Sequence, residues 1–377
     1  MRVAIRYFTG TGNTARACSI LAEEFIAASW DTDLMEVREN AADPYAGLDG
    51  ADLTVIAFPV LGFAPPITMK RWLSRIPKDR RHRKGQDVDG HRRNAAVLCV
   101  GGAAYHKGRY IPGWGADAPF AAARILKRRG LSCAAIAEVS YPENWRQISN
   151  PPDEDQCRDI RGRNDPAVRN LARALAAGER SVLERDIRAR VLMAGAAALI
   201  GFFGRGPLTR TFIAASSCTG CGLCARGCPA GAIRMRRGRP RWTLKCVDCN
   251  RCINTCPVNA IRTSSLALAS HFAWGLGATA VALSVPLPLD WPLPARVSIR
   301  SLALLAFFAF QLGPFSALLA LARAVPRFRP RFERSFMEGF RRNLAPDFNT
   351  DELQPDDGKA LGETQKGILD EVTRRKG

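Results

Sequence analysis

Eight cysteines within 39 residues constrain this chain more than any other feature. They form two copies of one spacing: three cysteines separated by two residues, then a fourth after three more, followed by proline. The copies are Cys218, Cys221, Cys224, Cys228 with Pro229, and Cys246, Cys249, Cys252, Cys256 with Pro257. A loop with this spacing turns three thiolates toward one cubane, while the fourth cysteine reaches the other cluster.

The doubled run therefore predicts two [4Fe–4S] clusters that exchange one ligand each. Cluster I is predicted to take Cys218, Cys221, Cys224 and Cys256, and cluster II to take Cys246, Cys249, Cys252 and Cys228. The alternative is a pair of zinc sites, but zinc usually binds two CxxC halves and would not account for the trailing prolines. Clusters with this ligation carry one electron at a time, so the segment indicates electron transfer.

The first 180 residues alternate short β-rich apolar runs with helical patterns. Strands are predicted at 2–7, 33–37, 53–58, 95–100 and 133–139, and helices at 13–28, 66–76, 116–129 and 166–177. This alternation predicts an α/β domain with a parallel sheet covered on both faces. A basic insert at 78–93 is expected to be a solvated loop.

A loop rich in glycine and threonine follows the first predicted strand. Its backbone N–H groups can converge on an anion at a helix N-terminus, and its hydroxyls can add donors. It is not a Walker A loop, because no Gly-Lys-Ser/Thr follows, and it is not the dinucleotide fingerprint, because position 15 is alanine instead of the third glycine. A plain glycine turn is the alternative. The predicted phosphate-binding residues are Thr9, Gly10, Thr11, Gly12, Asn13 and Thr14.

Three further loops accompany this one: Phe-Pro-Val-Leu-Gly at 58–62, Gly-Gly-Ala-Ala-Tyr at 101–105 and Tyr-Pro-Glu-Asn at 141–144. Together with the doubled cysteine run, they make residues 1–262 resemble the EFR-type flavodoxin–ferredoxin fusion family. The resemblance implies a flavodoxin-like doubly wound sheet of order 2-1-3-4-5. It also implies FMN at the carboxyl ends of strands 1, 3 and 4, with electrons passing between the flavin and the clusters.

By position, the loops at 59–63 and 101–105 are expected to flank the flavin ring. The residues predicted there are Pro59, Val60, Gly62, Phe63, Gly101, Gly102 and Tyr105. Phe63 or Tyr105 could stack on the ring; the alternatives are a core Phe63 and a surface Tyr105. The first loop lacks the tryptophan, and the second the acidic residues, that are frequent in simple flavodoxins.

Two apolar runs follow the cysteines. Residues 263–289 and 301–322 contain no formal charge when His271 is counted as neutral. About 20 apolar residues cross a bilayer core, so both runs qualify. Arg and Lys lie before the first run and after the second, which predicts a hairpin with both ends in the cytoplasm. The alternative is a pair of core helices in a soluble domain.

The net charge of +20 attracts polyanions. No nucleic-acid recognition motif accompanies it, so a membrane surface is the favoured partner and nucleic acid is not. No signal peptide begins the chain. The predicted location is the inner membrane, with the redox domains in the cytoplasm.

These expectations divide the chain into five parts. They are a flavodoxin-like domain at 1–180, a linker at 181–213 that contains an apolar helix around 191–204, a ferredoxin domain at 214–262, two membrane helices at 263–323 and a tail at 324–377. The tail is basic at first, and after Arg342 it is polar and expected to be loose. Four scattered thiols, Cys18, Cys99, Cys133 and Cys157, are expected to be buried and inert. His271 invites a haem hypothesis, but a second axial ligand is missing, so packing or proton relay is preferred.

No catalytic residue set stands out. The sequence therefore predicts a membrane-anchored flavin/iron–sulfur electron-transfer protein, acting as an oxidoreductase or as its reductase component. The alternative is a non-catalytic relay subunit that docks to a redox partner protein. The oligomeric state is not predicted.

Overall fold

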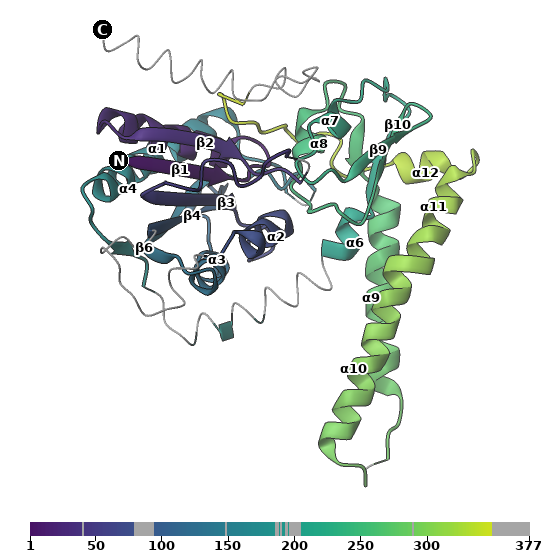
Figure 1. Ribbon diagram of the computed structural model, residues 1–377. Coiled ribbons are helices and arrows are strands. Elements are labelled where there is room, and N and C mark those ends of the chain that lie inside the picture. The colour runs from purple at the N-terminus through teal and green to yellow at the C-terminus, as the bar shows by residue number, and fades with distance from the viewer. Residues whose placement is uncertain are drawn as a thin grey trace.

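The computed structural model describes residues 1–39, 41–78, 94–147, 149–184, 188, 191–192, 195, 205–288 and 290–348. The described residues form a flavodoxin-like domain, a ferredoxin unit and a long helical hairpin that projects away from both (Figure 1). The predicted basic insert after Lys78 and nearly all of the predicted apolar helix at 191–204 lie outside the described residues.

A parallel sheet forms the centre of the N-terminal domain. Its strands lie in the order β2-β1-β3-β4-β6-β7, and a short β5 pairs antiparallel with the end of β4. The strands are β1 (Arg2–Tyr7), β2 (Asp31–Glu36), β3 (Leu53–Pro59), β4 (Asn94–His106), β5 (Arg109–Ile111), β6 (Ser132–Pro142) and β7 (Ser181–Val182). The predicted flavodoxin-like order is confirmed, with β6 as the fifth parallel strand. The edge strand β7 extends the sheet past residue 180.

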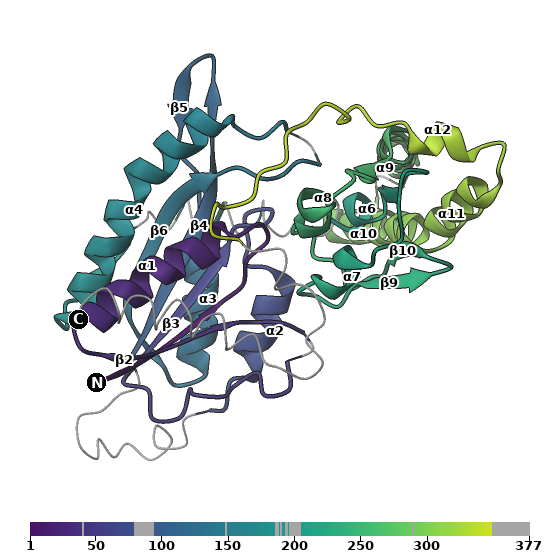
Figure 2. The ribbon, with the colours of Figure 1, turned by 90° about the horizontal axis from the view of Figure 1, so that it is seen from above.

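Helices cover both faces of this sheet (Figure 2). They are α1 (Asn13–Ala27) with α4 (Glu154–Ala176) on one face, and α2 (Ile67–Arg75) with α3 (Ala118–Arg128) on the other. Successive side chains of β1 point to opposite faces, so Val3 and Ile5 enter one apolar core and Ala4 enters the other. Burial on both faces explains why the central strands β3 and β4 are largely apolar, whereas the edge strand β2 is partly exposed and carries three acidic residues.

The helix predicted to begin at Pro166 in fact begins at Glu154. Asp153 caps it: its carboxylate accepts from the Gln156 amide, and the Gln156 side chain accepts from the Asp153 amide. This capping box satisfies the first turn. Pro166 lies inside the helix, where it costs a helical hydrogen bond without ending it.

The ferredoxin unit consists of two similar halves. Strands β8 (Phe212–Ala214) and β11 (Ile261–Thr263) pair with each other, as do β9 (Ile233–Arg236) and β10 (Arg239–Trp242). The cysteine loops run into the short helices α7 (Leu223–Arg226) and α8 (Arg251–Thr255), and α6 (Arg205–Thr209) precedes the unit. Left-handed residues recur at matching positions, namely Gly220, Gly222 and Gly231 in the first half and Asp248, Asn250 and Asn259 in the second. Glycine, Asn and Asp adopt this conformation most readily, so both loops curl in the same way.

Two helices form the hairpin. The first is α9 (Ser265–Ser284), and the second runs continuously through α10 (Leu293–Phe310), the π-helical η3 (Gln311–Phe315) and α11 (Ser316–Ala324). Both are long and apolar enough to cross a membrane, and most of their residues are not buried within the protein. The second helix begins at Leu293, before the predicted residue 301. The prediction started at 301 because it followed the charge-free run, and the first turns of the helix contain Arg296 and Arg300.

The segment after the hairpin returns to the flavodoxin-like domain. It passes through α12 (Arg329–Glu333) and then runs along the ferredoxin unit to the α1 end of the sheet (Figure 2). The expectation of a loose tail is wrong for its first part, because several residues up to Phe348 make hydrogen bonds or packing contacts there. The rest of the tail lies outside the described residues.

Two buried arginines join the ferredoxin unit to the flavodoxin-like domain. The guanidinium of Arg251 donates to the backbone oxygens of Gly10 (2.9 Å), Thr9 (2.7 Å) and Gly227 (3.0 Å), and it pairs with the Glu36 carboxylate. From the opposite direction, Arg146 donates to the Ile253 oxygen at 3.0 Å. Each guanidinium links backbone groups that are distant in sequence, so the two units are fixed against each other.

Arg251→Met is expected to lower the free energy of unfolding by about 3–5 kcal/mol. It removes the hydrogen-bonded partner of the nearly buried Glu36 carboxylate, which keeps only the longer contact with Arg38 at 3.7 Å, and it removes the donor to three backbone oxygens. Urea unfolding of the anaerobic full-length protein measures this. The matched control is Arg173→Met, which removes an ion pair to Glu24 from an exposed arginine and should cost no more than about 1 kcal/mol. Equal losses in the two variants would contradict the role given to Arg251.

Candidate functional site

A cavity of about 400 Å³ opens at the carboxyl ends of β1, β3 and β4. The predicted flavin-site residues that line it are Thr9, Gly10, Thr11, Asn13, Thr14, Pro59, Val60, Gly62, Phe63, Gly101 and Gly102. The structure thus brings the three predicted loops together. Gly12 and Tyr105 do not line the cavity.

Within the loop before α1, one hydroxyl is left without a partner. The Gly12 amide donates to Thr9 Oγ1 at 3.0 Å, and the Asn13 side chain donates to the Pro142 oxygen at 2.8 Å. The Asn144 side chain donates to Thr11 Oγ1. Thr14 Oγ1 is buried and has no hydrogen-bond partner in the described part of the chain. A buried polar atom of this kind needs a partner, and a phosphate oxygen would provide one.

Gly12 does not line the cavity but shapes the turn that leads into α1. Its φ of 95° places it in the left-handed region at the N-cap of α1. Glycine adopts this conformation without the steric cost that a side chain would bring. It therefore lets the chain turn sharply from β1 into α1.

Phe63 forms one wall of the cavity together with a residue that the sequence analysis missed. Gly62 and Phe63 both have positive φ, in a tight turn closed by hydrogen bonds between Leu61 and Ala64. The Phe63 ring meets Trp114 edge-on, with 5.6 Å between ring centroids. The signal for Trp114 was its place between Gly113 and Gly115, where an aromatic side chain stands on a loop.

Tyr105 is not at the cavity, contrary to its prediction as a ring contact. Strand β4 runs to His106 instead of ending at Val100, and this carries Tyr105 out into the hairpin with β5. There its hydroxyl donates to Asp159, and its ring packs on Tyr110 with centroids 5.9 Å apart.

The eight cysteines of the doubled run lie in two groups. Burial, and then the neighbouring thiols of Cys256, Cys221 and Cys218, raise the pKa of Cys224 to about 12. The other four cysteines, Cys228, Cys246, Cys249 and Cys252, line one small cavity with Phe212 and Trp242. These groups have the same membership as the ligand sets predicted from spacing.

The chemistry of these groups fits iron–sulfur clusters. Thiolates crowded in a buried site repel one another, so they need a cationic partner. In the described residues, no group of His, Cys, Asp or Glu is placed to hold a single metal ion. A cubane does not require such convergence, because its ligands bind different irons.

The last cysteine of each run also accepts a backbone hydrogen bond. The Ala232 amide donates to Cys228 Sγ at 3.3 Å, and the Ala260 amide donates to Cys256 Sγ at 3.2 Å. In both halves the donor lies four residues after the cysteine, beyond the proline turn. Such bonds favour the ionised sulfur, as a cluster ligand requires.

Cys249 connects the two cavities. It lines both the 400 Å³ cavity and the cavity of the second cysteine group. The phosphate loop also touches it, because a Cβ added at Gly10 would lie 2.5 Å from the Cys249 backbone oxygen. No residue needs to intervene between the flavin cavity and this ligand loop. Cys221 lies at the other extreme, as the exposed member of the first group.

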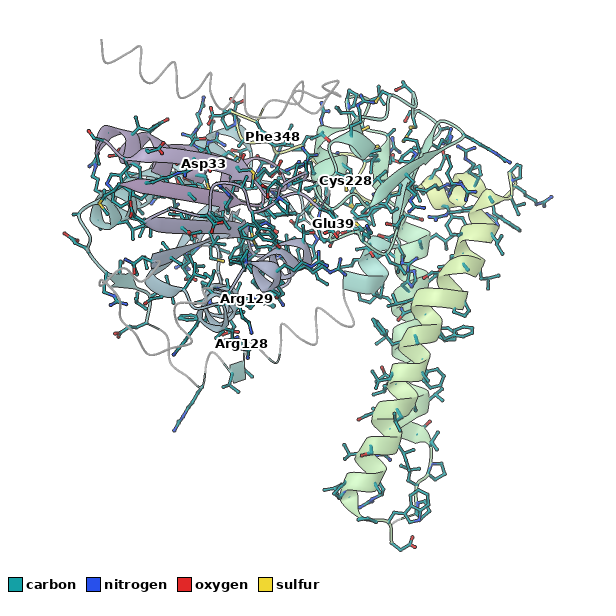
Figure 3. All side chains as sticks on the ribbon, in the orientation of Figure 1. Asp33, Glu39, Arg128, Arg129, Cys228 and Phe348 are labelled. Atoms are coloured by element: carbon teal, nitrogen blue, oxygen red, sulfur yellow. The ribbon has the colours of Figure 1, made fainter. Side chains whose placement is uncertain are left out.

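The returning tail covers the phosphate loop from outside. The Ala345 amide donates to the Thr11 oxygen at 2.8 Å, and the Asn343 side chain donates to the Glu143 oxygen at 2.9 Å. Phe348 packs over Gly12, where an added Cβ would lie 2.6 Å from the Phe348 Cβ (Figure 3). No sequence pattern near residue 345 indicated this contact.

The scattered thiols lie apart from both groups. Cys18, Cys99 and Cys157 are buried, and Cys133 is partly buried. Burial raises the pKa of Cys133 to about 11 and that of Cys18 further. Burial is the cause of both shifts, and no neighbouring thiol contributes to them as it does for Cys224.

Comparisons with known proteins find one family model and several structural neighbours. Residues 217–261 match the family model of a 4Fe-4S dicluster domain. A flavodoxin from the domain Archaea is 11% identical, with 46% of this chain and 99% of that chain covered and a TM-score of 0.28. Flavodoxin 1 from Bacillus cereus is 14% identical, with 47% and 98% covered and a TM-score of 0.31.

Rubredoxin oxygen:oxidoreductase from Desulfovibrio gigas is 16% identical, with 47% of this chain and 36% of that chain covered and a TM-score of 0.29. No curated protein sequence matches the chain. The strand order and the dicluster match together identify a fusion of a flavodoxin-like domain with a ferredoxin-type iron–sulfur domain.

Glu143 gives the cavity a pH-dependent feature. Its side chain lines the cavity against Gly102, and burial raises its pKa above the ordinary carboxyl value. Its contribution to stability is therefore fully present below the unfolded-state pKa and is lost as pH rises through the folded-state pKa.

The variant Glu143→Gln cannot ionise, so its thermal unfolding midpoint should fall less than that of the wild type as pH rises from 4 to 8. Differential scanning calorimetry across this range measures the difference. Glu179→Gln, at an exposed position, is the control and should follow the wild type. Parallel curves for all three proteins would contradict a raised carboxyl pKa.

Proposed function

We propose that this protein is a membrane-anchored electron carrier that passes electrons between FMN and two [4Fe–4S] clusters. Its role would be that of an oxidoreductase or its reductase component. The observation that carries the proposal is the position of Cys249, which lines both the flavin cavity and the cluster II cavity. Electron transfer depends steeply on distance, and the protein's contribution is to place cofactors next to each other.

The residues for each cofactor follow from the site. The loop from Thr9 to Thr14 would hold the FMN phosphate, with the unpartnered Thr14 hydroxyl as a donor. Phe63 and Trp114 would flank the ring, because aromatic faces and edges suit a flat conjugated system. When bound, FMN exchanges electrons in pairs or singly, and each cubane carries one.

The exposed side of cluster I suggests how electrons leave or enter. Cys221 is exposed, whereas the cluster II cysteines are partly or fully buried. A redox partner protein docking near Cys221 would approach cluster I, while cluster II stays beside the flavin. The same arrangement suits the second candidate function, a relay subunit of a larger redox complex.

The hairpin supports the membrane part of the proposal. Its helices have the length and hydropathy of membrane spans, with 17% and 11% of their most apolar windows buried in the protein. Arg and Lys lie near the ends that adjoin the ferredoxin unit, which favours a cytoplasmic location for both redox domains. The resemblance to the EFR-type family points to the same cofactors but extends no further than residue 262.

Cofactor analysis tests the central claim. Anaerobically purified protein should contain about eight iron, eight acid-labile sulfide and one FMN per chain. A value near four iron, or zinc in place of iron, would exclude the two-cluster proposal. Absence of flavin would exclude the electron path through the cavity but would not contradict the proposal of two clusters.

Single cysteine variants then assign the clusters. Cys249→Ala and Cys221→Ala should each lose roughly half of the iron, because each removes a ligand from one cubane. In Cys249→Ala, reduced flavin should no longer reduce the remaining cluster rapidly in stopped-flow absorbance. Cys99→Ala removes a buried thiol outside both groups and should retain all the iron.

The tail contact makes a separate prediction about flavin affinity. Phe348→Ala removes the side chain packed over Gly12 and should weaken FMN binding roughly tenfold, which corresponds to about 1.4 kcal/mol. Flavin fluorescence during dilution measures the release. Phe336→Ala, at an exposed position earlier in the tail, should release FMN at the wild-type rate, and equal release from Phe348→Ala would show that the tail does not close the site.

A further inference from the structure

Three arginines from three elements gather where the ferredoxin unit meets the hairpin. Arg323, in the last turn of α11, interacts electrostatically with Arg241 of β10 and with Arg210, just after α6. The Nε atoms of Arg210 and Arg323 are buried and have no hydrogen-bond partner among the described residues. Within the described part of the chain, none of the three forms an ion pair with a carboxylate.

A buried histidine lies near Arg210, because a hydrogen bond from the Ser264 amide to the Thr211 oxygen (2.9 Å) joins the chain after α6 to the start of α9. His271, in the second turn of α9, is 2% exposed, and both of its ring nitrogens lack partners among the described residues. It interacts electrostatically with Arg210. The Phe315 ring packs against it at 5.5 Å, and Gln311 donates to its backbone oxygen at 2.8 Å. These contacts hold the imidazole in place but leave its two ring nitrogens without hydrogen bonds.

This group needs a negatively charged ligand. Three guanidinium groups close together repel one another, and unpaired N–H groups in a partly buried site are costly. Guanidinium forks match the oxygens of a phosphate group and form strong charge-assisted hydrogen bonds with it. The neutral imidazole of His271 cannot compensate the repulsion between the guanidinium groups, so the charge balance favours an anionic ligand.

The position of the group selects the source of the anion. Arg323 ends the second apolar helix and His271 lies near the start of the first. In the proposed topology both lie at the cytoplasmic face of the bilayer, where anionic lipid headgroups concentrate. The structure therefore supplies cationic donors at the depth of a headgroup phosphate.

We propose that Arg210, Arg323 and His271, with Arg241 beside them, bind the phosphate group of one anionic lipid. This inference rests on the proposed membrane association of the hairpin. Arg210 also interacts electrostatically with Cys246, one of the proposed cluster II ligands. The lipid would join the hairpin to the ferredoxin unit at the place where these two parts meet.

Native mass spectrometry of the detergent-purified full chain tests the site. Phosphatidylglycerol, phosphatidylcholine and inorganic phosphate are added in separate arms. The wild type should retain one phosphatidylglycerol at least about tenfold more strongly than phosphatidylcholine. The double variant R210Q/R323Q should lose this preference. The control Arg128→Gln, an exposed arginine on α3 far from the hairpin (Figure 3), should keep it.

Each outcome decides the question. Equal phosphatidylglycerol binding by wild type and R210Q/R323Q overturns the site. Saturation by inorganic phosphate, with no advantage for the lipid, overturns the lipid as ligand and assigns the site to free phosphate. If R210Q/R323Q does not fold, the wild type alone decides, because a bound lipid raises its thermal midpoint with phosphatidylglycerol but not with phosphatidylcholine. Wild-type protein that is wholly soluble without detergent refutes the membrane proposal itself, independently of the adduct measurement.

Discussion

The buried guanidinium of Arg251 is the interaction on which the arrangement of the two redox domains depends. Arg251 lies between Cys249 and Cys252 in the second cysteine loop and donates to the backbone of Thr9 and Gly10 in the loop before α1. Its charge is balanced by Glu36 at the end of β2. One side chain therefore fixes the ligand loop against the flavin cavity, and this brings Cys249 to the cavity wall.

The tail contributes to the same junction from the other side. The chain leaves the ferredoxin unit, forms the hairpin and then comes back to Thr11 and Gly12. Arg251 and Phe348 therefore both contact the loop before α1. The Arg251 guanidinium also lies 5.3 Å from the centre of the Phe348 ring. Three regions far apart in the sequence thus share one small site.

Local patterns predicted local structure well. The strand β1 has the predicted bounds, and α1 differs by one residue at its end, because apolar periodicity and a glycine-rich turn define both. The start of α4 was missed because Pro166 resembles a first helical residue, while the true signal was the capping box at Asp153. Tyr105 was misplaced because the extension of β4 depends on pairing with β5, which periodicity does not reveal. Trp114 was missed because its loop is short and irregular.

The sequence by itself located the ferredoxin-type cysteine segment, the glycine-rich loop after the first strand and the two apolar helices. Each of these depends on spacing within a short segment, where covalent geometry limits what the chain can do. The tertiary structure decided that Cys249 lines the cavity and that the tail covers Gly12. These contacts join residues distant along the chain, and their formation depends on the packing and charge of whole domains. No local pattern encodes that balance, because the partner of each residue is chosen only when the domains assemble.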